Sequence, residues 1–162
     1  MSCGPAYQRF LTGAPASRIY TRFVTHDLQR FVEAQEPIYD QVRRELRAGQ
    51  KQSHWMWFIF PQLAGLGHSP MAQRFAIVDR SHAAAYWAHA LLGARLRECV
   101  ALVNSHTGRT ATQMFGYPDC LKLHSSLTLF HEVAPGELLF TQALTQLYGG
   151  APDPATLQLL EQ

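Results

Sequence analysis

Helix-starting and helix-ending signals recur from Asp27 to the end of the chain, and they restrict the fold more than any other feature. The pairs Ser69-Pro70 and Asp153-Pro154 each place a capping residue directly before a proline, which suits the first turn of a helix. Apolar residues recur every fourth position over 38–46, before Gly49 stops the pattern. No alternating apolar run of strand length stands out. The sequence therefore predicts an all-α fold, a single compact multi-helix domain with short connections.

The composition is that of a globular chain without a membrane span. Of its 162 residues, 47% are hydrophobic and 16% are charged, which is enough apolar material for a core. No apolar run approaches the roughly 18–20 residues that cross a bilayer, and no secretory signal opens the chain. The three cysteines include no CxxC pair, so a disulfide framework is not expected. We expect a cytoplasmic protein with no membrane partner.

Charge and missing motifs argue against several functional classes. The net charge is +2 and there is no run of basic residues, which argues against nucleic acid as a partner. The eight histidines include no HExxH motif and no pair four residues apart, so we expect no metal site. The glycine-rich GxGxxG and Walker motifs and the GxSxG elbow are also absent. We expect no cofactor.

Residues 1–25 differ from the rest of the chain. They contain three arginines but no acidic residue, and glycine and proline interrupt every periodic pattern. An arginine-rich, acid-free start is also typical of a mitochondrial transit peptide, but the prolines oppose the long amphipathic helix of such a peptide. We therefore expect a flexible N-terminal extension over 1–25 and a single all-helical domain over 26–162.

The segment SHWMWFIFPQ, residues 53–62, is unusually rich in aromatic side chains. At about 100° per residue its apolar groups cover every side, which predicts a helix buried all round, with Ser53 as its cap. His54 and Gln62 bracket this apolar run, and buried polar groups need hydrogen-bond partners. In one interpretation, both satisfy backbone groups at the helix ends. In the functional interpretation, Trp55 and Trp57 are the walls of a ligand pocket, and His54 and Gln62 supply its polar contacts.

A second candidate segment is PDCLKLHSSLTLF, residues 118–130. On a helix, Lys122, Ser125 and Ser126 fall on a face beside the apolar stripe. One ammonium and two hydroxyls suit a phosphate or carboxylate ligand. Alternatively, the lysine extends past the core into solvent and the hydroxyls bond back to the preceding turn.

A third polar group lies in the stretch AHALLGARLREC. Its His89 and Arg95 are candidate ligand-binding residues. The alternative is that they belong to an exposed helix face.

Three segments of the chain resemble the domain-of-unknown-function 1810 family, sometimes labelled calpastatin-like. They are SHWMWFIFPQLAGLG, AAAYWAHALLGARLREC and MFGYPDCLKLHSSLTLF, and the similarity spans about Leu28 to Leu160. The resemblance implies an all-helical single domain and no particular reaction. The candidate residues that match the family motifs are His54, Trp55, Trp57, Pro61, Gln62, His89, Arg95, Lys122, Ser125 and Ser126. Ala90, Cys120 and His124 depart from the pattern, which weakens an acidic pair at Asp119-Cys120 and an extra cation at His124.

Two functional hypotheses follow. In the first, a preformed pocket between segments 53–62 and 118–130 binds a small anionic or nucleotide-like ligand. If the protein is an enzyme, we expect a metal-independent hydrolase or transferase in which His54 transfers a proton and Lys122 stabilises developing negative charge. In the second, the protein is an interaction or homo-oligomeric module without activity, and residues 138–140 contribute an apolar group to a homodimer contact.

Overall fold

The structure, a computed structural model, describes residues 26–162, which form ten α-helices and an isolated parallel β-bridge between Leu63 and Ile77. The all-α prediction is confirmed. The predicted extension over 1–25 lies outside the described residues. In chain order the helices are α1 (Gln29–Gln35), α2 (Tyr39–Ala48), α3 (Met56–Ile59), α4 (Pro70–Arg74), α5 (Arg80–Ala88), α6 (Ala90–Asn104), α7 (Ala111–Phe115), α8 (Asp119–Val133), α9 (Leu138–Tyr148) and α10 (Pro154–Leu160).

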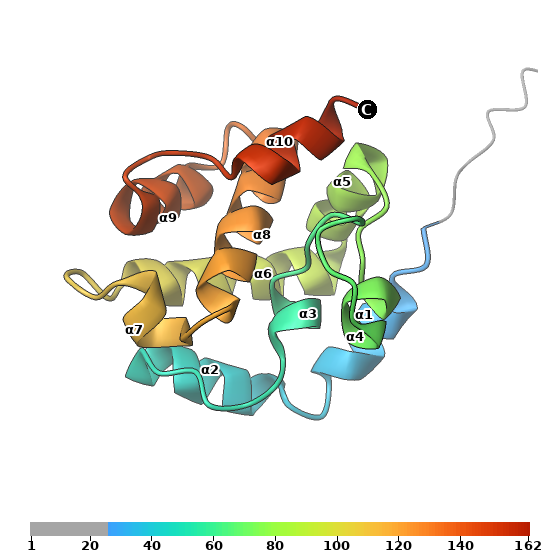
Figure 1. Cartoon of the computed structure of the whole chain (residues 1–162). Helices are drawn as coiled ribbons and strands as arrows, with labels where there is room; N and C mark the ends of the chain where they lie inside the picture. Colours follow the sequence, from blue (N-terminus) through green and yellow to red (C-terminus); the bar gives the residue numbers. More distant parts are fainter. Residues whose placement is uncertain (1–25) are drawn as a thin grey trace, which may run out of the picture.

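Helices α6 and α8, of 15 residues each, organise the domain. They run in different directions through the middle of the view in Figure 1, and the shorter helices surround them. Both α5 and α9 pack against α6 and against α8, while α2 packs on α6. Helices α7 and α10 pack on α8, and α1 packs beside α3. Helix α8 therefore connects helices α7 and α10 to the core.

The core is a continuous series of aromatic contacts between helices. The ring of Tyr86 lies 5.1 Å from that of Phe31 and 5.4 Å from that of Phe130, centroid to centroid. Phe130 in turn lies 6.0 Å from Phe140. These four side chains are buried, and contacts of this kind contribute beyond the apolar area they remove from water. They fasten α1, α5, α8 and α9 together.

The local signals in the sequence correctly marked several helix ends. Ser69 and Asp153 cap α4 and α10 with their side chains, and a proline follows each one. Gly49 ends α2 in the left-handed conformation, with φ of 65°, which glycine adopts without steric cost. These predictions are confirmed.

The predicted helix over segment 53–62 is wrong in extent and in its cap. Helix α3 covers only Met56–Ile59, and its N-cap residue is Trp55 rather than Ser53. The hydroxyl of Ser53 instead donates to the Glu45 carboxylate of α2. The same carboxylate accepts from Ser53 N at 3.1 Å, Gln52 N at 2.9 Å and Trp55 Nε1 at 2.8 Å. These bonds to α2 hold the backbone of the segment out of a helix until Met56.

Glu45 is a buried carboxylate whose charge is stabilised by hydrogen bonds. Burial alone would raise its pKa, but the donors from Ser53, Gln52 and Trp55 outweigh that effect and lower the pKa to about 2. Because the pKa is lower in the folded state, this stabilisation is complete above the ordinary value of 4.5. It is lost as the pH falls from about 4.5 towards 2.

Glu45→Gln tests this hydrogen-bond centre. An amide keeps the shape but removes the charge and presents an N–H to groups that already donate, so we expect a loss of roughly 1–3 kcal/mol of unfolding free energy at neutral pH. The difference from wild type should shrink as the pH falls from about 4.5 towards 2, measured by urea unfolding. Glu161→Gln, at an exposed position near the C-terminus, is the control and should match wild type. Equal stability of Glu45→Gln and wild type at neutral pH would contradict this role.

Candidate functional site

A cavity of about 400 Å³ lies between the α3–α4 segment, the first half of α8 and the start of α10. We call it the Lys122 cavity. Four residues singled out in the sequence line it together: Trp57, Gln62, Lys122 and Ser125. They come from two segments of chain about sixty residues apart, and the fold brings these segments to one place.

One face of α8 forms a wall of this cavity. Its lining residues follow the spacing of neighbours on a helix surface: the N-cap residue Pro118, and Leu121, Lys122 and Ser125. Ser126 lies about 100° further round the helix than Ser125, and it is completely buried. Its hydroxyl has no hydrogen-bond partner among residues 26–162. The structure thus places Ser126 in the core, away from the cavity lining.

Lys122 is held between an aromatic ring and a carboxylate. Its ammonium lies 4.9 Å from the centroid of the Trp57 ring, a cation–π contact. It is also 2.9 Å from Oδ1 of Asp119, whose Oδ2 is 2.7 Å from the ammonium of Lys51. Burial alone would raise the pKa of Asp119, but the two lysines hold it below its usual value. One carboxylate therefore serves two ammonium groups, which leaves an excess of one positive charge among these three side chains.

Asp153 brings a carboxylate into the same cavity. Its Oδ2 accepts from Ser125 Oγ at 3.0 Å, from Thr156 N at 3.1 Å and from Thr156 Oγ1 at 2.6 Å. The sequence marked Asp153 only as a helix cap. Its second role depends on the packing of α10 against α8, which no local pattern reveals.

Gln62 enters the cavity from a segment with a fixed backbone. Its carbonyl accepts from Ile77 N at 2.9 Å, and Ala64 N donates to Ile77 O at 2.7 Å. These bonds form the β-bridge at Leu63 and anchor the main chain. The carboxamide lines the cavity and makes no hydrogen bond to another side chain or to the backbone of residues 26–162. It can therefore contact a ligand without losing an internal bond.

The two tryptophans of the aromatic segment have different surroundings. Trp55 is fully buried, donates to Glu45 and has the Lys51 ammonium 5.0 Å from its ring centroid. Trp57, in contrast, lines the Lys122 cavity.

His54 is exposed and does not line the Lys122 cavity. The histidine among the lining residues is His68, next to the cap of α4. Sequence reasoning missed His68, because a lone histidine in a glycine-rich turn carries no distinctive signal.

His89 and Arg95 lie away from the Lys122 cavity. The Nδ1 atom of His89 accepts from Leu91 N and Leu92 N, both at 3.2 Å, so this side chain caps α6. Arg95 lies 2.8 Å from the Glu36 carboxylate, and its guanidinium is 4.5 Å from the centroid of the Tyr39 ring. Both side chains thus make structural contacts within the domain.

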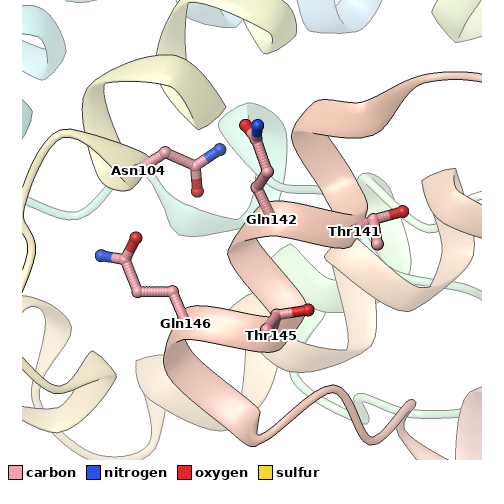
Figure 2. Close-up of a pocket in the computed structure, with 5 residues that line it drawn as sticks. All are labelled: Asn104, Thr141, Gln142, Thr145 and Gln146. Carbon is pink, nitrogen blue, oxygen red and sulfur yellow. The ribbon is translucent and has the colours of Figure 1, made fainter.

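A second hollow, of about 460 Å³, lies between the end of α6 and the outer face of α9 (Figure 2). We call it the amide cleft, and it is lined by Asn104, Thr141, Gln142, Thr145 and Gln146. Asn104 Nδ2 donates to Leu139 O at 3.0 Å, and Gln146 Nε2 donates to His106 O at 2.8 Å. Figure 2 shows Asn104 of α6 facing the two glutamines of α9. The cleft lining contains amides and hydroxyls but no group that titrates.

Within residues 26–162, no group of three or more histidine, cysteine, aspartate or glutamate side chains is placed to hold a metal ion. No helix in this range has the length and apolar character to cross a membrane.

The fold and the cavity define a class of protein: a small all-helical domain with an aromatic, lysine-bearing cavity on one side of a long helix. A family model described as "Protein of unknown function (DUF1810)" matches residues 25–160, so the chain belongs to this family. The crystal structure of the conserved hypothetical protein Rv1873 from Mycobacterium tuberculosis is similar, with 51% identity and a TM-score of 0.82. The match covers 84% of this chain and 97% of that one. No curated protein matches the chain.

Asp119→Asn tests whether one carboxylate joins the two lysines. The variant leaves two ammonium groups, one of them nearly buried, without their shared counter-charge. We expect a loss of roughly 2 kcal/mol or more of unfolding free energy, measured by urea unfolding at neutral pH. Asp40→Asn removes an exposed partner of Arg43 and should change stability little. If the two variants were equally stable, Asp119 would not have this role.

Proposed function

We propose that the Lys122 cavity binds a small anionic or nucleotide-like ligand. The observation that carries the proposal is the placement of the Lys122 ammonium over the Trp57 ring, with Gln62 and Ser125 lining the same space. A cation, a flat aromatic surface and a few orienting polar groups are the usual contents of a small-ligand pocket. The volume of about 400 Å³ also lies in the usual range for such pockets, roughly 300–1,000 Å³.

The charges near the cavity support an anionic group at Lys122. Asp119 is shared between Lys51 and Lys122, so it neutralises only one of the two. Asp153 brings negative charge to the cavity, but three hydrogen bonds from Ser125 and Thr156 stabilise its Oδ2. A ligand that places its anion at Lys122 and a hydroxyl or N–H donor near Asp153 would match both sides.

Catalysis at this cavity would use His68 rather than His54. A metal-independent hydrolase or transferase needs a proton carrier within reach of the bound ligand. Of the two imidazoles, His68 lines the cavity and His54 does not. Lys122 would then stabilise negative charge that develops on the substrate.

Lys122→Met tests the binding proposal. In a thermal-shift screen of nucleotides, sugar phosphates and small carboxylates, a ligand of wild type should raise the melting temperature by a few degrees, because it binds only the folded state. The variant removes the ammonium but keeps an apolar side chain beside Trp57, so it should lose this shift. Arg47→Met, at an exposed position of α2, should retain it. The proposal fails if no compound in the screen stabilises wild type.

A second candidate function is association with another copy of the chain through the outer face of α9. This helix has no charged residue over its 11 positions, and Leu138 at its start is 67% exposed. The amide cleft on the same face is lined only by groups that both donate and accept hydrogen bonds. Such a surface is complementary to itself, as a two-fold interface requires, and the centres of interfaces are depleted in charged residues.

Thr145→Lys tests this second candidate. In a two-fold dimer the substitution would bring like charges together, so the variant should be monomeric at concentrations where wild type is a dimer. Sedimentation velocity over a range of protein concentrations measures the effect. Thr112→Lys introduces the same charge at an exposed position of α7 and should leave the dimer intact. A wild-type protein that stays monomeric throughout the range would exclude the interface.

A further inference from the structure

Two exposed apolar residues lie in or just before the first turn of α8, the helix that lines the Lys122 cavity. Among the described residues, Tyr117 is 78% exposed and Leu121 is 51% exposed. Leu121 lines the cavity, and Tyr117 directly precedes Pro118, which also lines it. Single exposed apolar residues are common on protein surfaces, but neighbouring ones beside a cavity indicate a binding surface.

Leu121 shares its helix face with the polar groups of the site. It is adjacent to Lys122 in the sequence and lies one turn before Ser125, so apolar and polar contacts are available side by side. Leu66 and Trp57 add apolar lining from the α3–α4 segment. The cavity therefore has a polar part near Lys122 and an apolar part around Leu121.

We infer that the ligand is an amphiphilic anion: a phosphate joined to a largely apolar body, as in an aryl phosphate. The anionic group contacts Lys122, and the apolar body covers Leu121 and Leu66. A bare anion would use the ammonium but leave this apolar surface in water, with no gain from its burial. The inference rests on the proposed function and specifies its ligand class.

Calorimetric titration with inorganic phosphate and with phenyl phosphate tests the inference. Wild type should bind phenyl phosphate at least about tenfold more tightly than inorganic phosphate, because only the aryl compound buries the apolar wall. Leu121→Ser should weaken phenyl phosphate binding about threefold to tenfold and leave inorganic phosphate unchanged. Val78→Ser replaces an exposed apolar residue outside the cavity lining and should change neither affinity.

The outcomes separate this inference from the proposed function. If Lys122→Met binds both compounds as well as wild type does, both proposals fail. If neither compound binds wild type, if both bind with equal affinity, or if Leu121→Ser leaves phenyl phosphate binding unchanged, the inference is overturned. The proposed function then fails only if no compound in the thermal-shift screen stabilises wild type. The circular dichroism spectrum of each variant shows that the comparison is made on folded protein.

Discussion

The Glu45 carboxylate is the interaction on which the geometry of the candidate site depends. It lies in α2, where Gln41 Nε2 donates to it at 3.1 Å, and its other hydrogen-bond donors come from the segment that leads to α3. By accepting these hydrogen bonds, the carboxylate fixes Trp55 in the core and sets the residue at which α3 begins. The start of α3 in turn places Trp57 beside Lys122 of α8. Within residues 26–162 no cation pairs with this buried carboxylate, and its charge is tolerated because so many donors face it. The position of the aromatic wall thus follows from hydrogen bonds made outside the cavity.

The two tryptophans also show how one arrangement serves two purposes. Each has a lysine ammonium over its ring, Lys51 over Trp55 and Lys122 over Trp57, and both lysines contact the same aspartate. The first pair is closed in: Trp55 is fully buried and the Lys51 side chain is only 7% exposed. The second pair borders the cavity. The inner pair fixes the carboxylate, and the carboxylate fixes the outer ammonium at the edge of the cavity.

Local sequence patterns predicted the helices better than they predicted the site. Caps and apolar spacing act within a few residues, so the all-α fold and the ends at Gly49 and Ser69 could be predicted. Helical spacing also brought Lys122 and Ser125 together, but it could not show that Ser126, one residue on, points into the core. The bond from Ser53 to Glu45, and the approach of α10 that brings Asp153 to the cavity, are tertiary contacts. No periodicity encodes them.

Asp153 belongs to two structures at once, since it caps α10 and lines the Lys122 cavity. Replacing it with a side chain that cannot accept a hydrogen bond from Thr156 N would loosen the start of the C-terminal helix. A substitution at Asp153 that changes the charge of the cavity must therefore still cap α10. Asparagine, serine and threonine are the uncharged residues with a side-chain oxygen that serve best as caps. The same residue, Asp153, thus contributes both to the chemistry of the Lys122 cavity and to the attachment of α10.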